Sequence, residues 1–276
     1  ILGSAAFSNC SKLIGSLLIS DKLTEIQSYT FFRCNGLSSV QFSNSIERIY
    51  EYSFYECTGL TGIEFKDNLK SISQYAFYNC STASKITFKD EVTDISKYAF
   101  AYTSKLDDLT LPSKLVTITQ YSFENSGMKT IKLPKDLTAI ENFAFWHCEE
   151  LKGVEFLDEL LTIGEYAFNS CYSLKTIKFN EKLNSIGRGA FAHCTSLEEL
   201  HFNETLTQTP EYGFYNCTKL KEIQFNKQMS SIGASCFKYC TDLGNLEFNE
   251  SLITINDFAF ESCHSLKSIT FNEKLR

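Results

Sequence analysis

The cysteines are the residues whose type and spacing first suggest chemistry, because ten of the eleven recur at one place in a repeating pattern. Each of the ten lies three residues after a phenylalanine, and most neighbours in the series are 23 residues apart. A row of thiols could bind a metal, respond to oxidation or form disulfides. The ten are Cys10, Cys34, Cys57, Cys80, Cys148, Cys171, Cys194, Cys217, Cys240 and Cys263.

Their arrangement favours a structural role over these three chemistries. Zinc sites need ligands that converge, as in C-x₂-C, whereas cysteines 23 residues apart lie along a line. If each repeat stacks on the next, neighbouring Cβ atoms lie about 4.8 Å apart, beyond the roughly 3.5–4.5 Å that disulfides favour. We therefore predict a structural ladder of buried thiols that pack at a turn and weakly bond a neighbouring carbonyl, with no cofactor.

No other group of side chains forms a recognisable catalytic or metal-binding motif. His147 and His193 each precede a ladder cysteine, but two repeats, or about 10 Å at the strand spacing, separate them, too far to share one ion. G-x-S-x-G, H-E-x-x-H, Walker and G-x-G-x-x-G motifs are missing, and the carboxylates are scattered. These features argue against an enzyme.

The residues just described belong to a repeat that tiles the whole chain. Phe100 and Phe123 continue the phenylalanine series where the cysteine is missing, with Thr103 and Ser126 in its place. Successive phenylalanines are 23 residues apart, except for one spacing of 24 after Phe7 and one of 22 after Phe123. Repeats of this length indicate a solenoid or a comparable array.

Within a repeat, such as residues 174–194, the apolar positions predict three short elements. Residues 177–179 alternate apolar and polar side chains, which is typical of a strand with one buried face. Residues 183–186 form a second short extended run, and residues 190–194 fit one helical or 3₁₀ turn, since residues three apart share a face.

A unit this small buries its apolar residues only by stacking on its neighbours, with strands in register at about 4.8 Å. Apolar content of 43% with 21% charged residues fits a globular chain. No apolar run approaches the roughly 18–20 residues of a transmembrane helix. We therefore predict a β-rich α/β repeat solenoid of about 12 coils with short parallel strands, as a single array over residues 1–276.

The motif L-x-x-I-x-F-x-x-x-L-x-x-I-G-x-x-A-F-x-x-C over residues 174–194 resembles the BspA-like (treponemal-type) leucine-rich repeat family. This resemblance implies a curved, right-handed leucine-rich-repeat solenoid whose first strands line the concave face. It also implies extracellular or cell-surface proteins of mucosal bacteria and parasitic protists that work in adhesion and host contact. One departure is that the family's proline after the strand survives only at Pro112 and Pro134, whereas asparagine replaces it from Asn180 onward.

By that resemblance, the polar positions of the first strands are the expected ligand-binding residues on the concave face. They vary freely, as expected of positions that a solenoid scaffold does not constrain. The expected ligand is a protein or a glycan, from host matrix or another cell surface. The positions are Glu64, Thr87, Thr110, Lys132, Glu155, Lys178, His201, Gln224 and Glu247.

Charge narrows the range of partners. The net charge is −7 and no basic stripe occurs, so the chain is not expected to bind nucleic acid or an anionic membrane surface. Since no long apolar run occurs, these residues are not expected to insert directly into a membrane. Asn203 and Asn249 are the candidate glycosylation sites, because each stands in an N-x-S/T sequence in a predicted turn.

Two aromatic features flank the ladder phenylalanines. A column two residues before them, which includes Tyr29, Tyr52 and Tyr75, either forms a sticky stripe or covers the core between coils, and we favour the second. Aromatic residues directly after the ladder phenylalanine do not form a full column and are better candidates for exposed contacts. These are Phe32, Tyr55, Tyr78, Trp146 and Tyr215.

The ends of the chain suggest an alternative function. The sequence begins at Ile1 and ends at Arg276 partway through a repeat, so the array is expected to be incomplete at both ends. Open ends expose unpaired strand edges. The alternative to a ligand-binding module is therefore a structural solenoid that stacks end to end into an assembly or filament.

Overall fold

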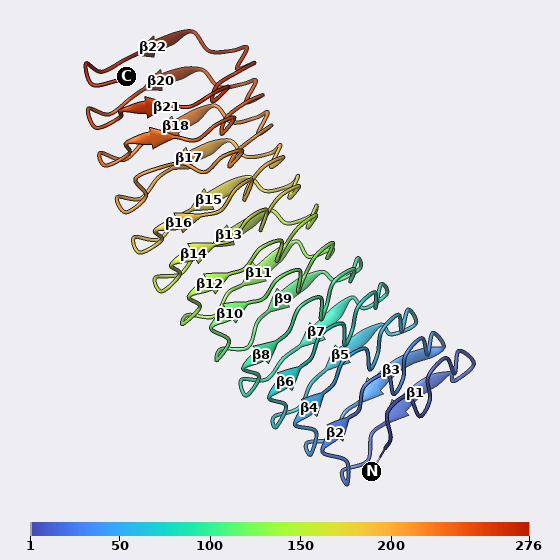
Figure 1. Ribbon diagram of the computed structural model, residues 1–276. Helices are drawn as coiled ribbons and strands as arrows, with labels where there is room; N and C mark the ends of the chain where they lie inside the picture. Colours follow the sequence, from blue (N-terminus) through green and yellow to red (C-terminus); the bar gives the residue numbers. More distant parts are fainter. Residues whose placement is uncertain (1, 276) are drawn as a thin grey trace. The chain divides into compact units, whose positions relative to one another are not determined.

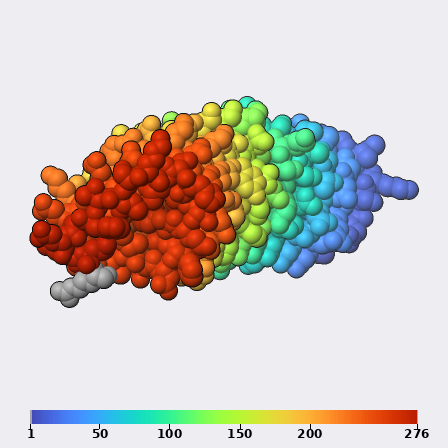
Figure 2. Space-filling model, turned by 90° about the horizontal axis from the view of Figure 1, so that it is seen from above, coloured from blue at the N-terminus to red at the C-terminus, as the bar shows by residue number. Residues whose placement is uncertain are grey.

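The computed structural model describes residues 2–275. The chain divides into two compact units, with the boundary between Asp136 and Leu137. Within each unit the chain winds in successive coils that lie side by side (Figure 1). The coils appear as consecutive bands of colour in the space-filling view (Figure 2). Ile1 and Arg276, at which the sequence suggested interrupted repeats, lie outside the described residues.

Each coil begins with a first strand that pairs in parallel with the first strands of adjacent coils. Among residues 2–275, each unit contributes six first strands, which agrees with the predicted solenoid of about 12 coils. In the first unit they are β1 (Gly15–Leu18), β3 (Leu37–Gln41), β5 (Gly62–Glu64), β7 (Lys85–Thr87), β9 (Asp108–Thr110) and β11 (Thr130–Lys132). In the second unit they are β13 (Gly153–Glu155), β15 (Thr176–Lys178), β17 (Glu199–His201), β18 (Glu222–Gln224), β20 (Asn245–Glu247) and β22 (Ser268–Thr270).

A second strand of only two residues follows in most coils and ends on an isoleucine, which is buried in all of these strands except β16 and β21. In the first unit the second strands are β2 (Glu25–Ile26), β4 (Arg48–Ile49), β6 (Ser71–Ile72), β8 (Asp94–Ile95) and β10 (Thr117–Ile118). In the second unit they are β12 (Ala139–Ile140), β14 (Thr162–Ile163), β16 (Ser185–Ile186), β19 (Ser231–Ile232) and β21 (Thr254–Ile255). The extended run predicted from the sequence is therefore a real strand.

The third side of the coil differs from the predicted helical or 3₁₀ turn, because none of the residues 2–275 is in a helix. Left-handed residues interrupt the segment, for example Tyr29 at φ 59° and Arg33 at φ 56°. Alternate N–H groups close tight turns, as from Phe32 to the Tyr29 carbonyl at 3.1 Å. The N–H groups between them reach the next coil, as from Phe31 to the Ser53 carbonyl at 2.8 Å.

This pattern explains why a helix does not form. A helix would direct all its N–H groups along the segment itself, whereas this segment must donate half of them to the neighbouring coil. Left-handed non-glycine residues cost of order 1 kcal/mol or more each, and stacking against identical coils holds them in place. The third side is thus a third ladder between coils rather than a helical turn.

The ladder phenylalanines form the centre of the core in both units. In the first unit Phe31, Phe54 and Phe77 are at most 2% exposed, and successive rings stack at 5.2 and 5.0 Å. In the second unit Phe168 and Phe191 stack at 5.3 Å with an interplanar angle of 2°. Each such pair is worth about 0.5–1.5 kcal/mol beyond the burial of its area.

The ladder cysteines line the same core and use their thiols as donors. The carbonyl of Phe31 accepts the backbone N–H of Cys34 at 3.1 Å and the thiol of Cys57, one coil further on, also at 3.1 Å. The same contact recurs in the second unit, where the thiol of Cys194 lies 3.4 Å from the Phe168 carbonyl. All eleven cysteines are free, and all except Cys10 are buried.

Two coils of the first unit replace the thiol with a hydroxyl. Thr103 donates to the carbonyl of Phe100 at 2.9 Å, and its oxygen lies 2.8 Å from the hydroxyl of Ser126 in the next coil. The side chains at the cysteine position therefore form hydrogen bonds even in the two coils where Thr103 and Ser126 replace cysteine.

The two irregular spacings are absorbed locally. The extra residue after Phe7 forms a bulge at the start of β1, where the register with β3 shifts between Gly15 and Ser16 and Gly15 takes φ 86°. The missing residue after Phe123 shortens the turn at Gly127, whose Cβ would lie 2.2 Å from the carbonyl oxygen of Ser104. Glycine is required at both places, by conformation in one and by close approach in the other.

Replacing one ladder phenylalanine tests how much the phenylalanine column contributes to the free energy of unfolding. We expect Phe191→Ala to lower the free energy of unfolding by about 3–5 kcal/mol, since a large cavity opens between two stacked rings. Denaturant titration followed by circular dichroism measures it. Tyr172→Ala removes an aromatic ring that is 39% exposed and should cost less than about 1 kcal/mol. Equal losses in the two variants would contradict the role of the column.

The ladder thiols should resist alkylation in the folded protein. Burial raises the pKa of Cys57 to about 12 and that of Cys263 to about 11, so the reactive thiolate is scarce near neutral pH. We expect iodoacetamide to modify Cys10 in the native protein and all eleven cysteines after denaturation, as counted by mass spectrometry. Rapid native modification of Cys57 or Cys194 would be inconsistent with this packing.

Candidate ligand-binding face

The strand face is the outward side of the first strands, and it is built by the alternation that the sequence predicts. In the second unit Val154, Ile177, Leu200 and Ile223 point inward and are at most 7% exposed. The residue after each one points outward, because successive side chains of a strand alternate. The strands pair without a shift of register, so the outward side chains form a straight row.

In the second unit this row is Glu155, Lys178, His201 and Gln224, all exposed. Adjacent members lie about 4.8 Å apart by the spacing of paired strands. Glu247 is exposed on β20, which pairs with β22 and is not part of the ladder from β13 to β18. Four of the five predicted residues of this unit are thus brought together, and Glu247 stands apart from the paired row.

A hydrogen-bond network holds part of this row in one orientation. Gln224 Nε2 donates to Glu222 at 2.9 Å, so Gln224 Oε1 is left to accept from His201 Nδ1 at 2.7 Å. The other imidazole nitrogen of His201 lies 3.8 Å from Glu199. These bonds place the proton of the neutral imidazole on Nδ1. The carboxylates of Glu199 and Glu222, on the neighbouring outward row, therefore orient the row side chains.

In the first unit the predicted residues are Glu64, Thr87, Thr110 and Lys132. Glu64 and Thr87 are paired in register on β5 and β7, and Thr110 and Lys132 are paired on β9 and β11. All except Thr87, which is half-buried, are exposed. Lys66 bonds Glu64 at 2.7 Å, and this hydrogen bond lowers the pKa of the carboxyl group.

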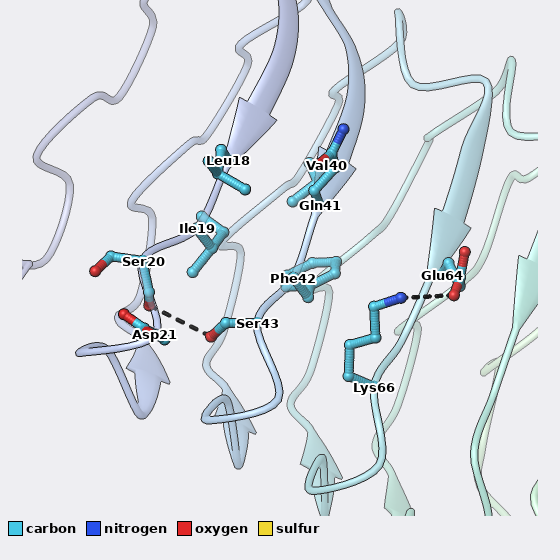
Figure 3. A pocket seen from close by; sticks show the side chains of 10 residues that line it. All are labelled: Leu18, Ile19, Ser20, Asp21, Val40, Gln41, Phe42, Ser43, Glu64 and Lys66. Atoms are coloured by element: carbon cyan, nitrogen blue, oxygen red, sulfur yellow. Dashed lines mark hydrogen bonds and ion pairs between the residues drawn. The ribbon is translucent and has the colours of Figure 1, made fainter.

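Two hollows lie along the first strands, one in each unit. The one in the first unit has a volume of about 790 Å³ and runs along the ends of β1, β3 and β5 (Figure 3). Lys66 and Glu64 close one side of it through their ion pair, and Phe42 lies between the strands. A comparable hollow of about 670 Å³ lies between β18 and β20, beside Gln224 and Glu247. Such a surface fits an extended partner better than a small enclosed molecule.

The histidines and acids do not assemble into a metal centre in the described part of the chain. Residues 2–275 contain no group of three or more His, Cys, Asp or Glu side chains placed to hold an ion. His193 instead contacts Asn216 at 3.0 Å, and His147 lies 3.6 Å from Glu149. Within the same residues, no helix is long and apolar enough to cross a membrane.

The aromatic columns cover the core, with their edges turned outward. Tyr29, Tyr52 and Tyr75 stack face to face at 4.8 and 4.9 Å, so the faces of the rings are occupied by one another. Beside them runs a second column that sequence reasoning missed, with ring centroids 4.9–5.2 Å apart. Its members are Phe32, Tyr55, Tyr78 and Tyr102.

The second column was missed because Tyr102 stands one residue later than its partners and tilts by 50° against Tyr78. Its residues are half-buried rather than fully exposed contacts, and burial raises the pKa of Tyr78 to about 12. Trp146 and Tyr215, at the corresponding positions of the second unit, are half-buried as well. The columns are therefore part of the packing between coils.

The asparagines proposed as glycosylation sites have a different role. Asn203 is 7% exposed, and its Nδ2 donates to the carbonyls of Asn180 at 2.5 Å and Leu183 at 2.8 Å in the preceding coil. Asn249 repeats this contact with Asn226 at 2.5 Å and Met229 at 3.0 Å. The nitrogen that would carry a glycan thus joins coils in this structure, and glycosylation at these two residues stays a prediction.

Comparison with known proteins agrees with this architecture. The model of the BspA type leucine rich repeat region matches the chain in three overlapping stretches, residues 1–129, 93–217 and 162–276. A search of curated proteins finds no match.

Solved structures extend the comparison to whole arrays. A leucine-rich repeat protein from Bacteroides ovatus is 28% identical over 99% of this chain and 76% of its own, with a TM-score of 0.81. A leucine rich cell surface protein from Faecalibacterium prausnitzii is 24% identical over 97% and 75% of the two chains, with a TM-score of 0.55. The pneumococcal vaccine antigen PcpA is 19% identical over 88% and 74%, with a TM-score of 0.50, and like the Faecalibacterium protein shares the fold.

The phenylalanine, cysteine and strand ladders account for the Phe, Cys and Ile positions of the repeat motif, and the family model covers the chain from end to end. The chain belongs to the BspA-type leucine-rich repeat family.

Proposed function

We propose that this chain is a non-catalytic interaction module that binds a protein ligand through its strand face. Membership of the BspA-type family is consistent with a role in protein interaction or as a surface protein. The finer proposal is an adhesin that contacts host matrix or another cell from the extracellular side.

The observation that carries the proposal is the contrast between the two sides of the first strands. The inward positions hold only Val, Ile or Leu, because each must fit the same space against the next coil. The outward row of the second unit holds an acid, a base, an imidazole and an amide in succession at Glu155, Lys178, His201 and Gln224. A row of unlike, oriented polar groups on a rigid sheet suits recognition of one specific partner.

The surface location rests on resemblance to other arrays. The Faecalibacterium neighbour is a leucine rich cell surface protein and the pneumococcal neighbour is a vaccine antigen, and both share this fold. A scattered distribution of carboxylates and open, solvent-filled hollows supports binding over catalysis, since acid–base chemistry relies on groups held in an enclosed site.

The proposal is tested by changing the second-unit row without touching the core. We expect the triple variant Lys178→Glu, His201→Ala and Gln224→Ala to weaken binding to immobilised extracellular-matrix proteins at least tenfold, because it reverses one charge and removes the oriented network. Surface plasmon resonance with a panel of such proteins measures the affinity of wild type and variant.

Lys182→Glu is the matched control, because Lys182 is an exposed lysine in the turn after β15 and pairs with Glu159 at 2.7 Å. It makes the same charge change away from the strand face, so binding should stay within about twofold of wild type. Failure of the wild-type chain to bind any matrix protein, or equal losses in both variants, would refute the strand face as the binding surface.

A further inference from the structure

One coil of the second unit, around Thr209 and Pro210, lacks its second strand. The second strands pair in the order β12-β14-β16 and again as β19-β21. In the described part of the chain, the coil between them has at this second-strand position only an isolated bridge, between Gln208 and Ser231. We infer that this interruption is a built binding notch for one sugar ring, separate from the strand face.

The interruption has a direct cause in the sequence. In other coils the residue after the buried isoleucine donates its N–H to the isoleucine carbonyl of the preceding coil, as from Gly187 to Ile163 at 2.8 Å. Pro210 occupies this place and has no N–H, so the Ile186 carbonyl loses that donor. Thr209 replaces the isoleucine itself, and a smaller side chain leaves space beside Ile186.

The effect on Ile186 is visible in its burial. Ile163 and Ile232, its counterparts in neighbouring coils, are at most 1% exposed, whereas Ile186 is half-buried. Ile255, in the last second strand of the described residues, is half-buried as well, but Ile186 is followed by further coils and still reaches solvent.

One neighbouring residue is matched to the proline. The missing Cβ of Gly213 would lie 2.6 Å from Pro210 Cγ, although other coils tolerate alanine there. The N–H of Gly233 donates to the Thr209 hydroxyl at 3.0 Å. Gly213 therefore leaves room for the Pro210 ring, and the Thr209 hydroxyl is occupied by the next coil.

The resulting hollow has a volume of about 340 Å³. Ile186 and Pro210 supply an apolar surface, while the amides of Asn184 and Gln208 supply polar groups beside Ser231 and Asn256, whose side chains bond one another at 3.3 Å. The carboxylate at its edge, Glu211, already pairs with Arg188 at 3.1 Å. The notch therefore offers hydrogen bonds and an apolar patch without an unpaired charge.

This chemistry selects a neutral polyol. Amide side chains donate and accept together and so match neighbouring hydroxyl groups, whereas an ion would lack a counter-charge. The volume lies at the lower end of ligand pockets, roughly 300–1,000 Å³, which suits one ring with its substituents. The apolar surface of Ile186 and Pro210 suits the C–H face of such a ring. This site and the strand face use different strands, so the inference does not depend on the proposed function.

Methyl-resolved NMR of the complete chain provides the test, with methyl glycosides of glucose, galactose, mannose and N-acetylglucosamine as probes. We expect at least one glycoside to shift the Ile186 methyl signals saturably at millimolar concentration. The signals of Ile163, which is 1% exposed at the same position of the preceding coil, should not move. No saturable shift of Ile186 with any of the four probes overturns the inference, whatever the result for the strand face.

A repaired coil supplies the matched variant. Thr209→Ile, Pro210→Ser and Cys236→Ala together restore the side chains that other coils carry, fill the notch and return the N–H donor. This variant should fold with an unchanged circular dichroism spectrum and lose the saturable shift. Gln208→Ala, which leaves the coil as it is, should weaken the shift at least threefold. Wild-type shifts in the repaired variant would also overturn the inference.

Discussion

The structure depends on one constraint, which is that every coil must offer its neighbours the same donors and acceptors at the same places. The first strands, the second strands and the turn segment each form a ladder of backbone hydrogen bonds between coils. Even the side chains join in, since the Cys57 thiol and the Asn203 amide both donate to carbonyls of the preceding coil. Because a single coil cannot satisfy its own backbone, the coils are stable only together.

That constraint divides the residues into two classes with different freedom. A residue facing the next coil is fixed in size and polarity, which is why the Phe and Cys columns persist through both units. A residue facing outward on the first strands contacts solvent and other exposed side chains but not the core, so Glu, Lys, His and Gln follow one another there. The same scaffold can therefore carry unrelated recognition surfaces without loss of its core.

Features that repeat as one residue type could be predicted from the sequence. Features that repeat only as one backbone conformation could not. The 23-residue spacing of Phe and the alternation at Ile177-Lys178-Phe179 were sufficient to predict the coils, the strands and the outward row. The left-handed residues, such as Tyr29 and Arg33, carry no signal because unlike residues share the conformation. The contact of the Asn203 amide with the preceding coil carries no local signal either, since the sequon describes neighbours in sequence only. The notch at Pro210 needed the stacked structure, because the hydrogen-bond donor that proline removes serves the Ile186 carbonyl of the preceding coil.

The unpaired state of the cysteines has a consequence for how the array is made. Small exported domains often depend on disulfides, and their folding then waits for an oxidant and for the correct pairs to form. Here eleven cysteines remain single while ten of them are buried in the folded chain. Side chains in register point in parallel, so the fold contains no wrong pairing that must be undone. The array can reach the same structure in reducing and in oxidising surroundings, and coils can be added or lost over evolution without disturbing a covalent framework.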